Sequence, residues 1–285
     1  MSRIRPLLQR LAAQAVSEGA GVTVHRTIGT PALKRLDPFL MLDHFGSNDP
    51  DDYIAGFPDH PHRGFITLTY MLDGHMQHRD SLGNTGELRA GGVQWMKAAS
   101  GVIHSEMPQQ QAGLMRGFQL WINLPAREKM SDPEYQEFQP ERIPQYQGAG
   151  QQVKIICGEY AGRRGPIQDP HTEVGYFDIA IEGGARFVHP VPAGHRCFAY
   201  VFEGSAETQG ETLATHTLAV FGDGDTVELQ AGSAGTRLIL VAGRPLNEPV
   251  AQYGPFVMNT QAEIETAFMD YRSGTLVKTR AITRA

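Results

Sequence analysis

Short runs of alternating or continuously apolar residues, separated by glycine-containing turns, recur along most of this chain. The run from Phe65 to Leu72 is rich in β-branched and aromatic residues, and Asp73-Gly74 follows it as a hairpin signal. The run from Phe118 to Leu124 alternates as a strand does when it buries one face. Because such runs outnumber helical patterns, the chain is predicted to be all-β.

This strand pattern lapses once, in a polar stretch between Arg127 and Gln152 that keeps no sustained period. A second β-rich block follows it, from Val153 through Val241. We interpret the polar stretch as a connection between domains. Two domains are therefore expected, over residues 1–147 and 148–285.

The two ends of the chain have patterns of their own. Near the C-terminus, Asn259 to Glu263 fits a helix cap and predicts a short helix to about Tyr271. Residues 1–16 place arginines among leucines, which predicts a short amphipathic helix or a frayed arm. Pro6 and Gln9 interrupt the apolar core that a signal peptide needs. No run approaches the ~18 apolar residues of a membrane span, so we expect a cytoplasmic protein without a membrane partner.

Composition narrows the function. Hydrophobic residues make up 41% of the chain, and 32 glycines and 18 prolines agree with a fold rich in turns. The formal net charge of −6 argues against direct binding of nucleic acid. The two cysteines, Cys157 and Cys197, each fall in an apolar run and are expected to be buried thiols. They are too few for a cysteine-ligated zinc site.

Two histidine-centred doublets carry the candidate chemistry. His60 and His62 are separated by one residue, and so are His104 and Glu106. Because a strand repeats its side-chain direction every second residue, each doublet points both groups to one face. Two such strands in one small barrel would bring three imidazoles and a carboxylate together. That donor set suits a divalent first-row transition metal.

A short internal repeat relates the two blocks. Tyr70 to Gly74 finds a counterpart in Tyr200 to Gly204, at an offset of 130 residues. The same offset places Pro190 and Pro192 where His60 and His62 stand in the first block. We interpret the chain as a duplication in which only the first copy keeps its metal ligands.

The sequence around the doublets resembles the pirin family of bicupin proteins, and the resemblance extends from about Gly19 to about Tyr271. The stretches that carry it are Leu36 to Phe45, Phe57 to Phe65, Gly91 to Met96, Ser100 to Pro108 and Gly254 to Thr260.

This resemblance implies two face-to-face cupin (jelly-roll-type) β-barrels, followed here by the short C-terminal helix, with metal in the N-terminal barrel alone. It implies that one iron(II) is held by His60, His62, His104 and Glu106. Manganese, nickel, copper or zinc could occupy the same ligands, because affinity alone does not select iron. The general cupin pattern has a glutamate four residues after the second histidine, where this chain has Ile66.

The resemblance also implies an activity, the cleavage of quercetin or a related flavonol by O₂ as a 2,3-dioxygenase. In that hypothesis Glu106 is both a ligand and the catalytic base that accepts the flavonol proton. The alternative is a non-enzymatic, iron-dependent regulator that binds a transcription factor or a metabolic enzyme. A purely structural zinc site is disfavoured, because such sites prefer closed, sulfur-rich ligand sets.

Other side chains near the doublets have two interpretations each. Arg63 could steer an anionic ligand or be a solvated arginine beside the barrel mouth. His44 could support the site or simply pack, and His78 is interpreted as a structural or solvated residue at a turn. Five apolar residues could line a cavity, although barrel core is the favoured interpretation for each: Phe57, Phe65, Trp95, Met96 and Met107.

Overall fold

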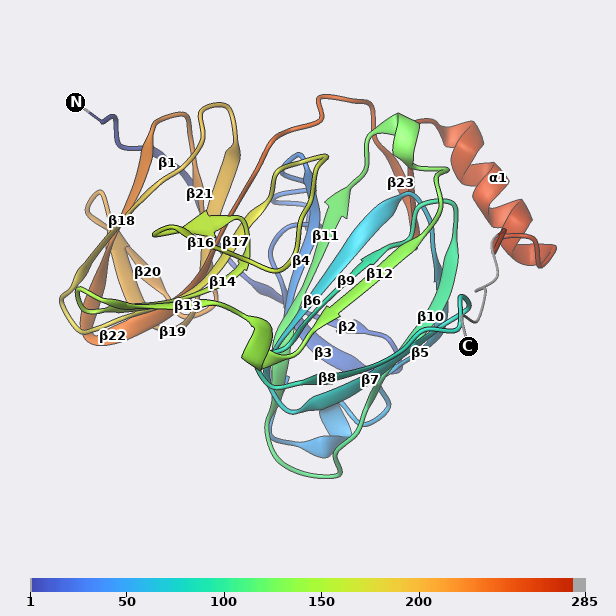
Figure 1. The fold of residues 1–285 in the computed structure, drawn as a ribbon, viewed down its shortest axis with the longest axis horizontal. Helices are drawn as coiled ribbons and strands as arrows, with labels where there is room; N and C mark the ends of the chain where they lie inside the picture. The colour runs from blue at the N-terminus through green and yellow to red at the C-terminus, as the bar shows by residue number, and fades with distance from the viewer. Residues whose placement is uncertain (1, 279–285) are drawn as a thin grey trace. The chain divides into compact units, whose positions relative to one another are not determined.

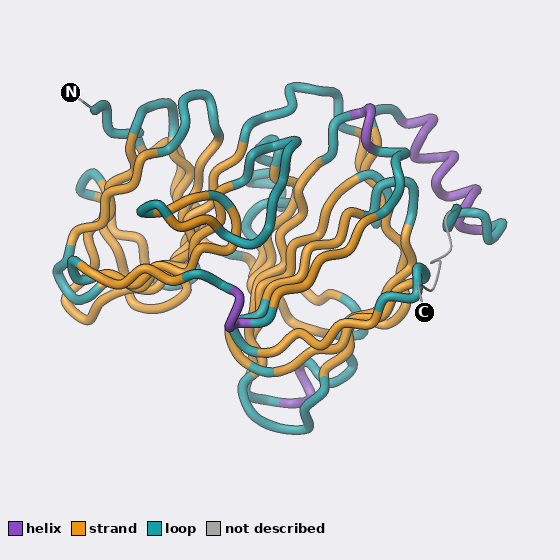
Figure 2. The backbone as a smooth tube through the Cα atoms, in the orientation of Figure 1, coloured by secondary structure: helices purple, strands orange, loops and turns teal. Residues whose placement is uncertain are grey.

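The computed structural model describes residues 2–278, and strands dominate that range (Figures 1 and 2). The chain divides into two compact units, each assembled from several segments. The unit that contains both histidine doublets, here the doublet unit, comprises Ala15–Gly29, Phe39–Pro140 and the described part of Leu246–Ala285. The other, here the apolar unit, comprises the described part of Met1–Gln14 together with Thr30–Pro38 and Glu141–Pro245. The predicted all-β fold is confirmed.

The doublet unit contains a seven-stranded and a four-stranded sheet. The larger has the order β12-β9-β6-β11-β4-β3-β2, with strands β2 (Gln14–Glu18), β3 (Val22–Arg26), β4 (Phe39–Ser47), β6 (Phe65–Asp73), β9 (Val93–Lys97), β11 (Met115–Asn123) and β12 (Glu134–Phe138). The smaller has the order β5-β10-β7-β8, with strands β5 (Phe57–His62), β7 (His75–Asp80), β8 (Thr85–Arg89) and β10 (Val102–Pro108). Both sheets pair antiparallel, as expected of a jelly-roll barrel.

The apolar unit is built on one nine-stranded sheet with the path β1-β21-β19-β22-β17-β14-β13, to which β18 and β20 add. Its strands are β1 (Leu7–Ala12), β13 (Gln145–Gly148), β14 (Gln151–Cys157), β17 (Gly175–Ile181), β18 (Arg186–Pro190), β19 (Arg196–Thr208), β20 (Glu211–Ala214), β21 (Thr217–Phe221) and β22 (Thr226–Gly243). A separate two-stranded sheet joins β15 (Glu159–Tyr160) and β16 (Arg163–Arg164).

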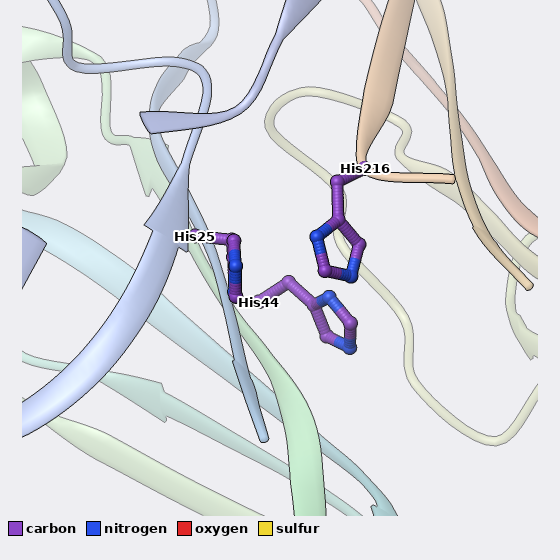
Figure 3. Close-up of side chains that lie close together, drawn as sticks. All are labelled: His25, His44 and His216. Atoms are coloured by element: carbon purple, nitrogen blue, oxygen red, sulfur yellow. The ribbon is translucent and has the colours of Figure 1, made fainter. Parts of the chain in front are cut away.

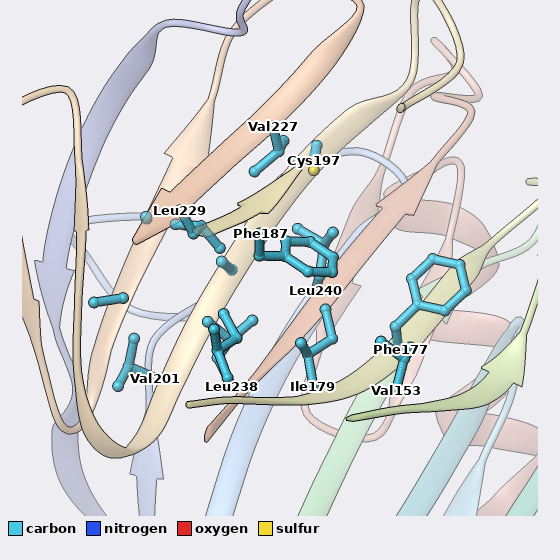
Figure 4. Packing of buried hydrophobic residues seen from close by; sticks show 14 of the residues in the cluster. Val153, Phe177, Ile179, Phe187, Cys197, Val201, Val227, Leu229, Leu238 and Leu240 are labelled. Atoms are coloured by element: carbon cyan, nitrogen blue, oxygen red, sulfur yellow. The ribbon is translucent and has the colours of Figure 1, made fainter. Parts of the chain in front are cut away.

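The interior of the apolar unit is filled by aliphatic and aromatic side chains (Figure 4). Residues from β14, β17, β18, β19 and β22 meet there, among them Ile179, Phe187 and Leu240. Cys197 belongs to this cluster and Cys157 is also buried, so both cysteines are the buried thiols that were expected. Burial raises the pKa of each thiol to about 12.

The N-terminal segment is a strand, so the predicted amphipathic helix or frayed arm is wrong. Strand β1 pairs antiparallel with β21, with Leu11 opposite Leu218. An edge strand offers unpaired backbone groups, and the hydrogen bonds gained there outweigh a weak local preference for a helix.

The C-terminal segment belongs to the doublet unit. It forms β23 (Ala251–Tyr253), β24 (Phe256–Met258) and the predicted helix, α1 (Gln261–Arg272), which is confirmed. A capping box starts α1, because the Thr260 hydroxyl accepts from the Glu263 backbone while the Glu263 carboxylate accepts from the Thr260 backbone. The helix buries Ile264. No helix in residues 2–278 is long and apolar enough to cross a membrane.

The polar stretch expected to connect the domains is largely structured. It contains β12, β13 and the short 3₁₀ helices η2 (Ala126–Glu128) and η3 (Pro140–Arg142), while η1 (Pro50–Asp52) lies earlier in the chain. The chain passes from the doublet unit to the apolar unit after Pro140, near the division expected after residue 147. The ends of the chain do not follow that division, because 2–14 joins the apolar unit and 246–278 joins the doublet unit.

Candidate metal centre

The two doublets lie on neighbouring strands of the smaller sheet. Strands β5 and β10 pair antiparallel, which sets His60 directly opposite His104. Ring centroids are 4.3 Å apart for His60 and His104, 4.7 Å for His60 and His62, and 4.9 Å for His62 and His104. One ligating atom from each of the three lies within 4.8 Å of the others. The structure therefore brings together the three imidazoles that strand periodicity predicted would converge.

Backbone carbonyls orient two of these rings. His60 Nδ1 is 2.8 Å from the Pro58 oxygen, and His62 Nδ1 is 3.4 Å from the Pro255 oxygen. A carbonyl only accepts, so each Nδ1 carries the proton and each Nε2 keeps a free lone pair. The Nε2 atom of His104 is buried without a hydrogen-bond partner in the described part of the chain. A buried nitrogen left in this way fits a metal ligand, because isolated buried polar atoms are unfavourable.

The fourth predicted ligand, Glu106, is buried one residue beyond an irregularity in the β5–β10 ladder. Its Oε1 lies 3.0 Å from the Thr69 hydroxyl, and its Oε2 accepts from Gln119 Nε2 at 3.0 Å. Thr69 and Gln119 lie opposite each other on β6 and β11, so the larger sheet holds the carboxylate of the smaller one. A ligating oxygen of Glu106 lies within 4.8 Å of ligating atoms of His104 and of a further histidine, His78.

Burial sets the protonation of the histidines. It lowers the pKa of His62 and of His104 well below the ordinary histidine value, and the neighbouring imidazoles lower both further. Both rings are therefore neutral at physiological pH, which is the form that binds a metal. These two neutral imidazoles, together with the His60 ring and the nearby Glu106 side chain, make a donor set that a divalent transition metal fits.

A cavity of about 640 Å³ opens at this cluster, and His60, His62 and Glu106 lie in its wall. Other parts of the lining are Val24, Met41, Phe45, Phe57, Met76 and Trp121. Of the five apolar residues considered from sequence, Phe57 lines the cavity. Phe65, Trp95 and Met96 are buried and are not in the lining, which agrees with their interpretation as barrel core.

The polar part of the cavity wall is a charged cluster that the sequence did not reveal. The Arg26 guanidinium donates to both carboxylate oxygens of Asp43, at 2.7 and 2.6 Å, and pairs with Glu18 at 2.6 Å. Asp43 is opposite Arg26 in the β3–β4 ladder. Only that cross-strand register, which a single sequence does not give, joins residues so far apart in the chain.

Arg63 has neither of the roles considered for it. Its side chain is only 1% exposed, pairs with Asp270 of α1 at 2.8 Å and donates to the Ser100 carbonyl at 2.6 Å. Both the steering and the solvated interpretation are therefore wrong. Lys129 is also buried and donates to the carbonyls of Gly64 and Val257. These two cations attach the C-terminal segment beside His62.

His44 packs outside the cluster. It lies opposite His25 in the β3–β4 ladder, with ring centroids 6.1 Å apart (Figure 3), and its ring stacks on Phe118 at 4.7 Å. Of the two interpretations of His78, burial contradicts the solvated one and leaves the structural one. His78 is buried behind His104, with the two Nδ1 atoms 3.4 Å apart.

Two cupin barrels in one chain, one of them with a histidine-rich centre, define a bicupin protein. Residues 21–122 match the family model described as Pirin, and residues 176–277 match the one described as Pirin C-terminal cupin domain. The chain belongs to the pirin family.

Individual relatives cover almost the whole chain. A Pseudomonas aeruginosa protein named putative quercetin 2,3-dioxygenase is 49% identical over 97% of this chain and 99% of its own. A pirin-like protein of Caulobacter vibrioides is 46% identical, over 95% of this chain and 99% of its own. The crystal structure of an Acinetobacter baumannii quercetin 2,3-dioxygenase superposes with a TM-score of 0.89 at 33% identity, covering 96% of this chain and 98% of that one.

Proposed function

We propose that this protein is a quercetin 2,3-dioxygenase-type enzyme that uses O₂ to cleave a flavonol, with iron(II) held by His60, His62, His104 and Glu106. The observation that carries the proposal is the convergence of three imidazoles, with Glu106 beside one of them, His104. His60, His62 and Glu106 also line a cavity of about 640 Å³. Cavities of roughly 300–1,000 Å³ suit small organic ligands. The names of a 49% identical relative and of a 33% identical solved structure point to the same substrate class.

When bound, iron(II) would supply a redox-active Lewis acid with positions left open for oxygen donors. The rest of the chemistry falls to the protein. Glu106 accepts the proton of the flavonol hydroxyl on a carboxylate oxygen, in the position that the Thr69 hydroxyl and the Gln119 amide fix. The Gln119 amide can only donate to Glu106 through Nε2, because its Oε1 already accepts from Thr69 at 2.6 Å.

The cavity walls position the substrate. Phe57, Met76 and Trp121 present apolar surface against which aromatic rings pack, and they exclude water from the reacting groups. The Arg26–Asp43 pair offers polar atoms to the substrate's remaining hydroxyls. Because this pair is already satisfied internally, it favours a neutral polyphenol over a free anion.

The direct test is turnover. Iron-loaded protein is mixed with quercetin in air, and loss of the flavonol absorbance is followed. The unsubstituted protein is expected to turn over, His62→Ala is expected to abolish turnover, and His171→Ala, in a loop of the apolar unit, is expected to retain it. Iron-loaded protein without turnover would reject the enzyme and favour the regulatory alternative.

Glu106→Gln tests the base separately. Its amide oxygen still accepts from Gln119 Nε2, but the side chain cannot accept the substrate proton, so turnover is expected to fall about 10²–10⁴-fold. An iron-retaining Glu106→Gln protein with undiminished turnover would remove the base role and leave the metal site intact.

A further inference from the structure

Behind His104 lies a buried row of polar side chains that the proposed reaction does not use. His104 Nδ1 is 3.4 Å from His78 Nδ1, and His78 Nε2 is 3.2 Å from Asp80 Oδ2. The side chains of His78 and Asp80 are 1% and 0% exposed, and His104 is buried as well. Strand β7 pairs with β10 so that His104 lies opposite Asp80, which is how the register brings the three together.

The far end of this row is fixed by the turn that follows β7. Asp80 Oδ1 accepts from the backbone N–H groups of Leu82 at 2.9 Å and Asn84 at 3.0 Å. Its Oδ2 accepts from Asn84 Nδ2 at 2.8 Å. Burial raises the Asp80 pKa, but the hydrogen bonds from His78 and Asn84 outweigh it, so the net shift is downward and the group is a carboxylate. A carboxylate only accepts, so His78 Nε2 must carry a proton.

The position of the proton on His78 then fixes the position of the proton on His104. With a single ring proton, placed on Nε2 by the contact with Asp80, His78 has a bare Nδ1, which can only accept. His104 Nδ1 must therefore carry a proton and donate it to His78, which leaves the lone pair of His104 on Nε2. That Nε2 is the buried atom without a hydrogen-bond partner in the described residues.

We propose that Asp80 and His78 are positioning residues that hold His104 in the Nδ1–H tautomer and so aim its Nε2 lone pair at the metal. This inference rests on the metal-site part of the proposed function and not on the flavonol. We call this arrangement of Asp80, His78 and His104 the relay. Tyr135 supports it by stacking on the His78 ring, with centroids 4.8 Å apart and planes 27° apart. The Tyr135 hydroxyl is anchored on Glu137 at 2.8 Å, which restricts rotation of the stacked pair.

Asp80→Asn is the sharpest test, because it keeps the shape and inverts the polarity. The backbone donors of Leu82 and Asn84 hold the amide oxygen where Oδ1 was, so the amide nitrogen faces His78. The Asn84 side-chain amide must then turn over, so that its oxygen accepts from the new amide nitrogen instead of its nitrogen donating to Oδ2. His78 then accepts on Nε2, donates from Nδ1 and forces the His104 proton onto Nε2. A metal must displace that proton, so the cobalt(II) affinity of the Asp80→Asn protein is expected to fall about 10–100-fold.

Two readouts other than activity are available. Ring ¹⁵N shifts of metal-free, ¹⁵N-histidine-labelled protein report which nitrogen of His104 carries the proton, and they are expected to exchange between parent and Asp80→Asn. Competition of cobalt(II) against a chelating dye gives the affinity. Asp169→Asn is the matched control, because Asp169 is also a buried turn aspartate that accepts backbone N–H bonds, in the apolar unit. It is expected to leave cobalt(II) affinity unchanged.

Rescue at His78 separates positioning from packing. His78→Asn places an amide oxygen where Nδ1 was, so it is expected to stay within about threefold of the parent affinity, while His78→Phe loses about 10–100-fold. Unchanged His104 ring shifts and unchanged affinity in Asp80→Asn would overturn the relay. So would an equal loss in Asp169→Asn, or a His78 ring shift on adding zinc that shows His78 bound to the metal itself. Absence of flavonol turnover alongside these expected shifts would overturn the proposed substrate and leave the relay standing.

Discussion

The two barrels of this chain use the same strand pair in opposite ways. In the doublet unit, β5 and β10 set Phe57 opposite Glu106 and His60 opposite His104. In the apolar unit, β18 and β22 set Phe187 opposite Leu229 and His189 opposite Val227. Directly opposed residues of antiparallel strands point to the same face. The apolar unit therefore keeps one histidine where the doublet unit has its predicted ligands, and aliphatic residues replace the others.

The supporting side chains differ in the same sense. Thr69 and Gln119 are opposed on β6 and β11, and they hold Glu106. At the offset of the internal repeat, Ala199 on β19 stands in place of Thr69, and it is opposed to Leu240 on β22. The carboxylate and the side chains that contact it are thus both absent from the apolar unit, because a buried polar group is tolerated only with its partners.

This comparison corrects the alignment made from the sequence repeat. The repeat equated His60 with Pro190, but β18 alternates so that Phe187 and His189 are buried and Pro190 is exposed. The step from Phe57 to His60 spans one residue more than the step from Phe187 to His189, at the irregularity in the β5–β10 ladder. A one-residue slip exchanges the faces of a strand. The equation of His60 with Pro190 is therefore wrong by one position.

The largest effect is expected from imposing the apolar pattern on the doublet unit. His104→Val copies Val227. It removes the imidazole that belongs both to the group of His60 and His62 and to the group of His78 and Glu106. Metal content after loading is therefore expected to fall below about a tenth of the parent. Elemental analysis of the desalted protein measures it. Undiminished metal content would show that His104 is not a ligand.

The reverse change tests what the apolar unit tolerates. Leu229→Glu buries a carboxylate within the aliphatic and aromatic cluster of the apolar unit, so the free energy of unfolding is expected to drop by about 3–5 kcal/mol, as when a buried charge loses its partner. Urea unfolding curves, followed by far-UV circular dichroism, measure the change in unfolding free energy. Leu229→Met is the volume-matched control and is expected to change stability by less than about 1.5 kcal/mol.

His189, the histidine that the apolar unit keeps at the position of the doublets, predicts that stability depends on pH. Burial lowers the pKa of His189 from its ordinary value of 6.5 to about 4, and the ring is stacked on Tyr160 at 5.2 Å. The unfolded chain therefore binds more protons between these values. Stability is full above pH 6.5 and falls by up to about 3 kcal/mol as the pH drops towards 4.

His189→Phe removes that dependence while keeping an aromatic ring. The difference in unfolding free energy between parent and variant is measured from pH 7 to 4. It is expected to change by up to about 3 kcal/mol over that range. A difference that stays constant over this range would mean that His189 does not titrate with a lowered pKa.

The smallest effect is expected from a complete exchange of polar for apolar residues. Glu106→Leu alone leaves the Gln119 amide without its acceptor and is expected to destabilise the metal-free protein by about 1–3 kcal/mol. Adding Thr69→Ala and Gln119→Leu, which copies Ala199 and Leu240, is expected to recover the loss to within about 1 kcal/mol. Paired unfolding curves decide it, and a triple variant less stable than the single one would contradict the comparison.

The sequence predicted what depends on local pattern. The strands over Phe65 to Leu72 and Phe118 to Leu124, and the helix after Asn259, follow from side-chain periodicity and capping, and the structure confirms them. The convergence of the three imidazoles followed from the two-residue repeat of a strand. The ligand and catalytic roles of these residues stay predictions.

What the sequence missed depends on register between distant strands. Glu106 has Thr69 and Gln119 as partners, and His104 has His78. Each of these partners is more than ten residues away in the chain from the residue it contacts. Strand β1 was missed for the same reason, since its partner is β21. A single sequence holds no record of which strands pair, so these contacts appear only in the folded chain.

The doublet unit takes its last segment, from Leu246 onward, from the end of the chain, and this has a consequence for synthesis on the ribosome. The carbonyl that orients His62 belongs to Pro255, 193 residues further along the chain. At roughly 5–20 residues per second, about 10–40 s separate the two. Throughout that interval the growing chain carries its histidines on a doublet unit that lacks its closing segment. The predicted metal site is thus completed late in synthesis, because the segment that carries Pro255 emerges long after the one that carries the histidines.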